Sequence, residues 1–307
     1  MMGLPKKRII GWLGVLTSLV FSSLWAYWGA VENFHEGWYS SSLRENLFML
    51  VFQYLLIPTV FTVLAVVALR WRTIGLVLHA AMAVFSLWFF SGASFSVVGL
   101  MIVIPIIALG LAYYFGQVQP KKWAYRLLIA LPILIVVAVS IPLGIKVSQR
   151  VDDGDFGMRI VEGNGVVLAW APRGPGWPDG GTSWQEARFL CSHLSEDGKT
   201  VMPEEQGVWR LPTVDEAVRS MMLHGTNAGG VWDGPEGKAT YERTPDKESP
   251  LWDVHSPVIY YWTEDTTLQD DQRAHIVVYH GGVFERRKTD GQRYLSFRAV
   301  KKVDGKE

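Results

Sequence analysis

Residues 127–155 read LLIALPILIVVAVSIPLGIKVSQRVDDGD. This stretch decides the fold because it changes abruptly from apolar residues to polar and charged ones. The formal net charge of the chain is zero, but the charge is divided unevenly on the two sides of this stretch. Up to Arg150 there are 11 Lys and Arg against 3 Asp and Glu, a net charge of +8. From Val151 onward there are 18 against 26, a net charge of −8. The sequence therefore predicts two parts in different surroundings, each with a function to be argued separately.

The first part contains five apolar runs that lack Asp, Glu, Lys and Arg: residues 9–31, 47–69, 74–90, 95–115 and 127–145. A membrane-spanning helix needs about 20 apolar residues, within a range of about 17–25. A charged residue at the bilayer centre costs about 2.5–3.5 kcal/mol, so the lack of charge is expected of spans. We predict a bundle of five transmembrane helices over 1–147, a solvated linker over 148–158 and a soluble domain over 159–307.

The orientation follows from the basic residues, which concentrate in alternate loops. Eight of them lie before the first run, between the second and third, and between the fourth and fifth: Lys6, Lys7, Arg8, Arg70, Arg72, Lys121, Lys122 and Arg126. The positive-inside rule then predicts a cytoplasmic N-terminus and, after five spans, an extracytoplasmic C-terminal domain. The first run is long for a signal peptide and lacks a small-residue cleavage site, so we interpret it as a retained anchor. The predicted location is the bacterial cytoplasmic (inner) membrane.

Polar chemistry inside the predicted spans is sparse. Pro58, Pro105 and Pro132 interrupt three runs, which indicates kinked packing or, alternatively, a broken-helix binding site. His79 is either a packed hydrogen-bonding residue or a proton-responsive group. Because no run contains Asp, Glu, Lys or Arg, ion-coupled transport is disfavoured.

The loop after the first run is richer in chemistry, with the sequence ENFHEGWY over residues 32–39. If the first helix continues through it, Glu32, His35 and Glu36 share one helix face. Such a group is a candidate divalent-metal site, or a candidate interface with the soluble domain. The alternative is an interfacial cap in which Trp38 and Tyr39 anchor the loop.

The second part alternates helical and strand-like segments, which predicts an α+β domain. Residues 165–170 form an apolar strand-like run, and strand-like segments return at 258–263, 275–280 and 294–300. Ser183 with Glu186, and Thr213 with Glu216, have the spacing of a capping box and so predict two helix starts. The DDGD stretch at 152–155 lacks the later glutamate of a calcium loop and is interpreted as part of the linker.

Several motifs then carry a family resemblance. They are Trp184-x-x-Ala187 with Cys191 and Leu194, then Trp209-Arg210-Leu211-Pro212-Thr213-x-x-Glu216, Tyr261-Trp262-Thr263, the segment 278–284 with Gly282, and Phe297-Arg298-Ala299-Val300. Together they resemble the family that joins the Lcl-type C-terminal domain of bacterial adhesins to the formylglycine-generating-enzyme (sulfatase-modifying-factor) domains. The resemblance covers about residues 165–301 and implies a C-type-lectin-like fold in which the motif residues are structural.

The resemblance also bears on catalysis. The oxidases of this family use a pair of late cysteines to bind copper, whereas Cys191 is the single cysteine of this chain. We therefore expect no enzyme of that type and no cofactor, although a structural divalent cation and a modifying enzyme without the cysteine pair stay open as alternatives. No motif for nucleic acid is present, and the negative charge of the domain disfavours such a partner.

The function expected from the sequence is binding, sensing or adhesion by a lectin-like domain displayed from the membrane, with an unknown ligand. The loops at 171–181 and 224–251 are the expected recognition surface. Trp177, Trp232 and Trp252 are candidate platforms for a glycan or peptide, unless they pack the loops themselves. The main alternative is a non-catalytic subunit of a membrane complex whose working part is the helical bundle, with a membrane-protein partner. Besides a glycan or peptide ligand and a membrane-protein partner, the lipid bilayer is an expected partner.

Overall fold

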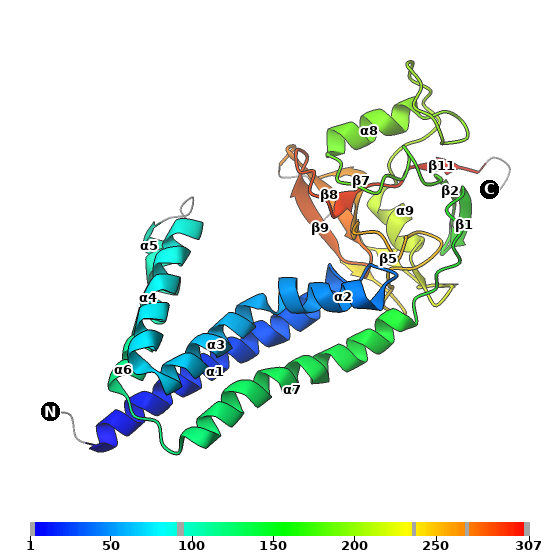
Figure 1. The fold of residues 1–307 in the computed structure, drawn as a ribbon. Coiled ribbons are helices and arrows are strands. Elements are labelled where there is room, and N and C mark those ends of the chain that lie inside the picture. Colours follow the sequence, from blue (N-terminus) through cyan, green and yellow to red (C-terminus); the bar gives the residue numbers. More distant parts are fainter. Residues whose placement is uncertain (1–3, 91–94, 235–237, 268–269, 304–307) are drawn as a thin grey trace. The chain divides into compact units, whose positions relative to one another are not determined.

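The computed structural model describes residues 4–90, 95–234, 238–267 and 270–303. The chain divides into two compact units, which are described separately (Figure 1). The first unit is Met1–Trp38 with Leu43–Ile145, and the second is Tyr39–Ser42 with Lys146–Glu307. The first unit ends at Ile145, two residues before the predicted boundary at residue 147, and the short segment Tyr39–Ser42 belongs to the second unit.

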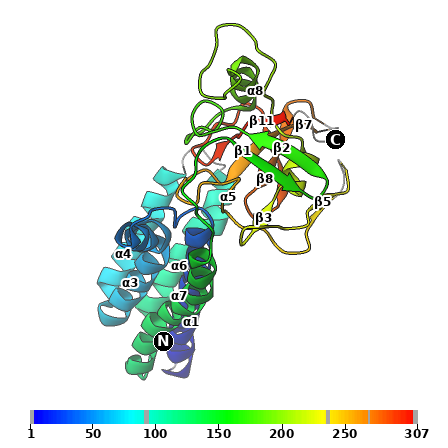
Figure 2. The same ribbon diagram turned by 90° about the vertical axis from the view of Figure 1, so that its right-hand side faces the viewer.

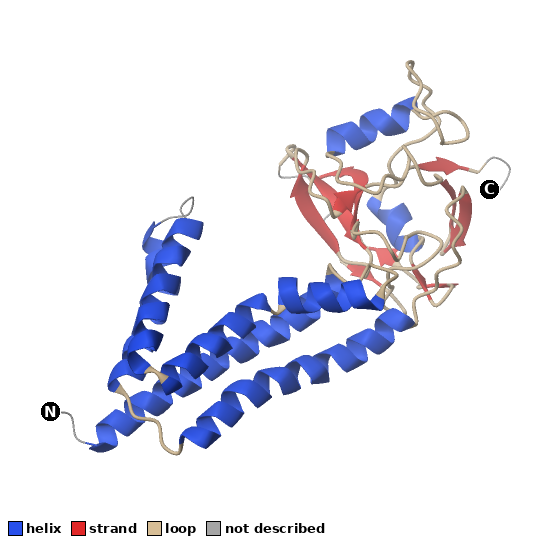
Figure 3. Cartoon of the chain, in the orientation of Figure 1, coloured by secondary structure: helices blue, strands red, loops and turns tan. Residues whose placement is uncertain are grey.

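The regular secondary structure described in the first unit is all helical, with short loops between the helices (Figure 3). Its elements in chain order are α1 (Leu4–His35), α2 (Leu43–Met49), the π-helical turn η1 (Leu50–Tyr54), α3 (Leu56–Arg70), α4 (Arg72–Phe89), α5 (Phe95–Val98), the π-helical turn η2 (Gly99–Val103), α6 (Ile104–Phe115) and α7 (Lys121–Ser148). Because these helices satisfy their own backbone hydrogen bonds, they suit a medium without water.

Three of the described helices are long and apolar enough to cross a membrane: Pro5–His35, Arg72–Phe89 and Lys121–Ser148. A fourth candidate is the pair Leu43–Tyr54 and Leu56–Arg70, which is bent by 56°. The remaining run forms a shorter apolar helix, Gly99–Phe115. Of the five predicted spans, the described residues thus contain three helices that could cross a membrane, or four if the bent pair is one span, by length and composition alone.

The second apolar run is broken because two local features meet at Leu55. That residue has φ −99° and ψ 6°, outside the α-helical range, and it follows the π-helical turn η1. Pro58 lies in the first turn of α3, where the missing proline N–H has no intrahelical partner to lose. The proline therefore starts a new helix instead of kinking an old one.

Small residues let the membrane helices approach closely. A Cβ atom at Gly29 of α1 would lie 2.4 Å from the backbone oxygen of Tyr54. Between α1 and α6, the Tyr113 hydroxyl donates to Ser18 Oγ over 2.9 Å. His79 Nδ1 lies 2.7 Å from the Gly75 oxygen one turn earlier in α4, which is a packed, hydrogen-bonded position. Close backbone approach and interhelical hydrogen bonds are the main forces between helices in lipid.

The second unit is an α+β domain, as the sequence predicts. Its longer elements are β1 (Arg159–Gly163), β2 (Val166–Trp170), α8 (Trp184–His193), α9 (Val214–Arg219), β7 (Tyr260–Thr266), β8 (Arg273–Val278), β9 (Val283–Arg287), β10 (Leu295–Ser296) and β11 (Val300–Lys302). The short strands β3 (Met222–Leu223), β4 (Thr226–Asn227), β5 (Val231–Trp232) and β6 (Ala239–Thr240) form two hairpin pairs.

Two sheets organise this unit. One has the order β1-β2-β11, with all pairs antiparallel, and Figure 2 shows β1 and β2 as adjacent arrows. The other has the order β10-β7-β8-β9, in which β9 is an edge strand. Trp170 is paired with both Arg159 and Val300, so the first and last strands of the unit lie on either side of β2.

Both predicted helix starts are confirmed. Ser183 Oγ accepts from the Glu186 backbone N–H at the start of α8, over 3.3 Å. Thr213 and Glu216 make the reciprocal capping box of α9. Strand β1, in contrast, was missed, because its residues alternate between buried and exposed without an apolar run.

Large aromatic side chains fill the core of the second unit. Trp170, Trp209 and Trp262 are each at most 2% exposed, and Phe297 is fully buried. Rings of this size bury 150–250 Å² each, which compensates for the small amount of regular secondary structure.

Candidate functional site

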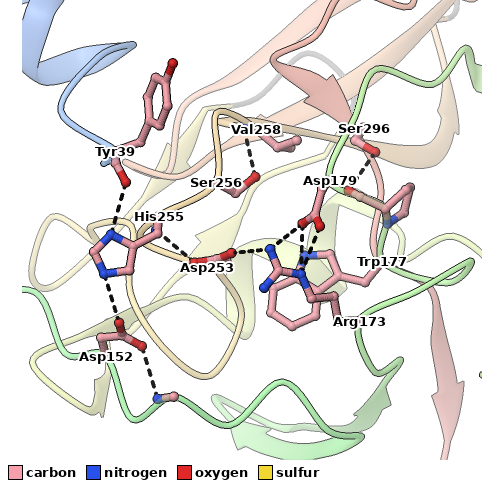
Figure 4. Close-up of polar contacts among 12 residues, drawn as sticks. Tyr39, Asp152, Arg173, Trp177, Asp179, Asp253, His255, Ser256, Val258 and Ser296 are labelled. Atoms are coloured by element: carbon pink, nitrogen blue, oxygen red, sulfur yellow. Dashed lines mark hydrogen bonds and ion pairs between the residues drawn. The ribbon is translucent and has the colours of Figure 1, made fainter. Parts of the chain in front are cut away.

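Five charged side chains gather where three irregular segments of the second unit meet (Figure 4). We call Asp152, Arg173, Asp179, Asp253 and His255 the charged loop cluster. The segments that carry it lie after α7, after β2 and before β7. Because none of them has a long run of regular structure, side-chain bonds must hold them in place.

The last of these segments is anchored by a row of buried polar residues. Asp246, Lys247, Glu248 and Ser249 are each at most 7% exposed. Asp246 pairs with Arg150 over 2.9 Å, and the Glu248 carboxylate accepts from the Val151 N–H over 2.8 Å. The Ser249 N–H in turn donates to the Val151 oxygen over 2.9 Å.

These bonds correct the prediction of a solvated linker over 148–158. Arg150 and Val151 are tied to the 246–249 segment by the bonds above, and Asp153 Oδ1 accepts from Ser249 Oγ over 3.0 Å. Arg159 also pairs with Asp153 over 2.7 Å, and its hydrogen bond is the largest influence that lowers the Asp153 pKa. The composition of residues 148–158 is that of a solvated linker. The sequence does not distinguish carboxylates that make such bonds from carboxylates that face solvent.

Lys247 is the most deeply buried amine of the domain. Its Nζ donates to the Ser256 carbonyl oxygen. Burial, with a smaller contribution from nearby Arg150, lowers the pKa of Lys247 to about 7, while Asp253 and Asp246 oppose the shift. The amine therefore changes charge close to neutral pH instead of staying protonated.

Arg173 is held between two carboxylates. Its guanidinium donates to Asp179 over 2.8–3.0 Å and to Asp253 Oδ2 over 3.0 Å. The side chain of Asp253 is 3% exposed, whereas those of Arg173 and Asp179 are 40% and 58% exposed. The hydrogen bond to Asp179 is the largest influence that raises the pKa of Arg173. A buried carboxylate thus fixes an exposed ion pair in one geometry.

His255 bridges two segments through its ring. Nδ1 lies 3.0 Å from the Tyr39 backbone oxygen, and Nε2 lies 3.3 Å from an Asp152 carboxylate oxygen. The backbone N–H of His255 donates to Asp253 Oδ1 over 2.8 Å. Both ring nitrogens therefore face oxygen atoms of other segments.

The cluster offers donors and acceptors side by side on an accessible surface. Asp152, Arg173, Asp179 and His255 all keep a substantial part of their side chains exposed. Nothing in the cluster combines a nucleophile with an adjacent base, so the arrangement suits recognition of a polar ligand better than bond chemistry.

The predicted tryptophan platforms fall into two groups. Trp177 and Trp252 are 5% and 3% exposed, so the prediction of exposed rings is wrong for both. Trp177 Nε1 donates to the Tyr261 hydroxyl over 2.6 Å, and Trp252 stacks on the Tyr261 ring at 3.9 Å. Trp232 is half-buried, with its ring edge-on to His275 at 6.4 Å. A loop-rich domain uses its large rings as core, which leaves Trp232 as the remaining candidate platform.

The predicted metal-site residues lie at the end of α1. The helix extends to His35 and the Glu36 N–H donates to the Glu32 oxygen over 2.8 Å, which confirms their helical spacing. In the described part of the chain, no group of three or more His, Cys, Asp or Glu side chains is placed to hold a metal ion. Trp38, three residues after the end of the helix, has φ +51°, and its ring stacks on Phe34 at 4.6 Å.

The motif residues of the resemblance have structural positions. Arg210 donates to both Glu216 oxygens over 2.5 and 2.6 Å and to the Leu211 oxygen, as expected for a residue that holds a loop. Trp184, Ala187, Leu211 and Trp262 are buried, Pro212 precedes the capping box of Thr213, and Gly282 lies between β8 and β9. Cys191 is 2% exposed, and burial raises the pKa of its thiol, so the unreactive protonated form dominates.

Arg298 is fully buried, and its position in the sequence does not predict this burial. Nε donates to the Ala171 oxygen over 2.9 Å, Nη1 donates to the Pro250 and Leu251 oxygens, and the guanidinium lies 3.7 Å from the Trp177 ring centre. Burial lowers the pKa of Arg298 to about 9. Carbonyl oxygens and a ring face, instead of a carboxylate, surround this cation and tie three loops together.

Most of the charged loop cluster was missed from the sequence. The DDGD stretch and the 171–181 loop were noticed, but nothing linked Arg173 to Asp253, which is 80 residues later in the chain. Charged residues in loops are common, so type and spacing carry little signal. Comparison with family models, with curated proteins and with solved structures returned no match for this chain.

Proposed function

We propose that this chain is a multi-pass protein of the bacterial cytoplasmic membrane that displays a ligand-binding domain outside the cytoplasm. The candidate spans support membrane embedding, and the alternate basic loops support a cytoplasmic N-terminus. Five spans follow if the bent pair crosses once and Gly99–Phe115 also crosses. Reporter fusions test this topology: an enzyme active only outside the cytoplasm works when fused after Lys302 and fails when fused at Trp71.

We also propose that the domain is C-type-lectin-like and related to the Lcl and formylglycine-generating-enzyme families. The support is local: two capped helices at the motif positions, and the Arg210–Glu216 pair at the start of the second. An experimental structure of the protein compared with those families tests this proposal. A different strand order around the two helices would contradict it.

The observation that carries the binding function is the charged loop cluster. Exposed Arg173 and Asp179 are fixed by buried Asp253, so the recognition groups are ordered before a ligand arrives. Preorganised groups lose less conformational entropy on binding. The cluster presents both charges and hydrogen-bonding groups, which suits a glycan or a peptide with polar side chains.

The experiment uses full-length protein in mild detergent on glycan and peptide arrays. We expect the double variant R173Q/H255Q to lose at least tenfold in affinity for whatever ligand the wild type retains. The matched control is R219Q, because Arg219 is also a half-exposed arginine in an ion pair, with Asp215 at 2.8 Å, away from the cluster. Equal loss in both variants, or no loss in the double variant, would contradict the proposed site.

A second candidate function is that of a subunit in a membrane complex. An apolar groove of about 430 Å³ lies between α7, α3 and the π-helical turn η1, lined by residues that include Leu55, Pro58 and Pro132. Only 11% of the apolar window of α7 is buried within the unit. A partner helix in this groove would cover both the groove and the exposed apolar side chains of α7. Purification in mild detergent tests this function through a partner present in a fixed ratio to the chain.

A further inference from the structure

A second surface of the soluble unit has a different chemistry from the charged loop cluster. Four cations lie over aromatic rings: Arg188, Arg286, Lys288 and Arg293, which we call the basic strip. Arg188, Arg286 and Arg293 are exposed, and Lys288 is half-buried. The strip therefore combines positive charge and aromatic surface where solvent can reach it.

One end of the strip is built around Trp184. The Arg188 guanidinium lies 4.9 Å and the Lys288 amine 4.5 Å from the centre of its ring. The backbone N–H of Trp184 also donates to the backbone oxygen of Lys288 over 3.0 Å, and this bond ties α8 to the end of β9. A single ring thus brings together two cations that are 100 residues apart in the chain.

The strip continues along the edge strand β9 to the loop before β10. Arg286 lies 5.8 Å from the ring centre of Tyr260, which is edge-on to Tyr294 at 5.5 Å. The neighbouring residue Arg293 lies 5.8 Å from the ring centre of Tyr39. The other end of the strip is therefore Tyr39, in the segment of sequence that joins α1 to α2.

The charge of the strip is not neutralised. None of its four cations forms an ion pair with another described residue, although Arg150, Arg159, Arg173, Arg210, Arg219 and Arg273 of the same unit all do. The nearest acid on β9, Glu285, points to the opposite face by strand alternation and is 3.8 Å from Arg273. An unpaired basic strip is unexpected in a domain whose net charge is −8.

We propose that the basic strip docks on anionic phospholipid headgroups. Arginine, lysine, tyrosine and tryptophan are the residues that favour the headgroup region, where charge and ring surface are both satisfied. Phe284 and Phe189, next to the strip in β9 and α8, are 50% and 56% exposed and add apolar surface. The strip also ends at Tyr39, only four residues along the chain from the last residue of α1.

This choice of ligand follows from the chain itself. A soluble polyanion would find the same cations, but a membrane-embedded chain always has headgroups within reach of the 39–42 segment. The inference rests on the proposed membrane embedding but not on what the charged loop cluster binds. The two can fail separately, because topology reporters test embedding and the following experiment tests docking.

The experiment places full-length protein in nanodiscs of phosphatidylcholine with or without phosphatidylglycerol. A dye on F284C, which is exposed whereas Cys191 is buried, is quenched at short range by a nitroxide attached to lipid headgroups. We expect strong quenching with phosphatidylglycerol, little without it, and a decrease as salt is raised. Each basic residue near an anionic surface favours docking roughly fivefold, so R286Q/K288Q/R293Q should reduce docking on the order of 100-fold.

The matched control is R287Q. Arg287 is exposed and adjacent to the strip, but strand alternation places it on the opposite face of β9. R287Q should therefore quench like the wild type, and the conservative variant R286K/R293K should do the same. Near-ultraviolet circular dichroism verifies that each variant is folded.

Three outcomes would overturn the proposal. The first is equal quenching with and without phosphatidylglycerol, and the second is no difference between the triple variant and R287Q. The third is tight binding of soluble polyphosphate to wild type in pure phosphatidylcholine, lost in the triple variant while phosphatidylglycerol has no effect. That third result would assign the strip to a soluble polyanion.

Discussion

At the scale of single residues, burial decides the chemistry of this protein more than residue type does. Lys247, Cys191 and Arg298 are all reactive or charged groups by type, yet each is at most 3% exposed. The same burial moves Trp177 and Trp252 from candidate binding platforms into the core. A residue type in a loop therefore predicts a role only once its exposure is known.

Lys247 yields a prediction for the pH dependence of stability. Its pKa is about 7 in the folded protein and about 10.4 in an unfolded chain. Between these values the unfolded state binds more protons, so the free energy of unfolding rises with pH. The destabilisation that comes from burying Lys247 is largest below pH 7, and it decreases as the pH rises. Over pH 7–9 this group contributes about 2 kcal/mol to the rise.

The variant K247M removes that contribution. Thermal unfolding of the full-length protein in detergent at pH 7, 8 and 9 measures the difference. We expect the unfolding temperature of K247M to depend less on pH than that of the wild type. Parallel pH dependences would show that the amine is not buried as a neutral group at pH 9.

At the scale of elements, local sequence sets the helix boundaries, and the close approach of neighbouring backbones sets the helix packing. Ser183 and Thr213 start α8 and α9 where the capping-box spacing predicts. The break at Leu55 is also local, since a π-helical turn and Pro58 meet there. Local signals of this type were readable in the sequence, whereas the angle between the two halves of the broken helix was not.

The variant T213A tests the cap of α9. Thr213 Oγ1 accepts from the Glu216 N–H over 3.2 Å, and alanine leaves that donor without its partner. Loss of an N-cap side chain costs about 1 kcal/mol of stability. We expect the soluble unit to unfold at a lower temperature, measured by near-ultraviolet circular dichroism. T226A is the control, because Thr226 is exposed outside the helix; an equal decrease in both would argue against a capping effect.

Gly29 and Gly99 form a matched pair for the packing of the membrane unit. A Cβ at Gly29 would lie 2.4 Å from the Tyr54 oxygen, whereas a Cβ at Gly99 would have no heavy atom within 4 Å. We expect G29A to force α1 and η1 apart and to lower the unfolding temperature in detergent. G99A should be neutral or slightly stabilising because alanine favours the helix. Similar behaviour of the two variants would contradict the close packing at Gly29.

At the scale of the whole molecule, the soluble unit is closed by contacts between distant segments. Tyr39, Asp152, Asp253 and His255 come from three separate parts of the sequence and meet around one imidazole ring. Since Tyr39 is within the stretch that joins two helices, the ring of His255 ties that stretch to the domain. The order of this stretch should therefore depend on the histidine.

The variant H255A therefore should loosen residues 39–42. Loss of the ring removes the hydrogen bond to the Tyr39 oxygen and the contact with Asp152. We expect faster amide hydrogen exchange in 39–42 and in 152–153, with little change in β7 and β8, which are buried core strands. H193A is the control, because His193 bonds within its own helix. Unchanged exchange in 39–42 would contradict the bridging role.

The sequence by itself determined the division into an apolar half and a polar half, the apolar helices of the first, the α+β class of the second and both capped helix starts. These follow from composition, periodicity and spacings of three or four residues, which act locally. Tertiary structure alone decided that Trp177, Trp252 and Arg298 are core, that residues 150–153 are anchored, and that Arg173, Asp253 and His255 form one cluster. Many of those contacts join segments about 80 to more than 200 residues apart, and no local pattern encodes which distant charge will be buried against which.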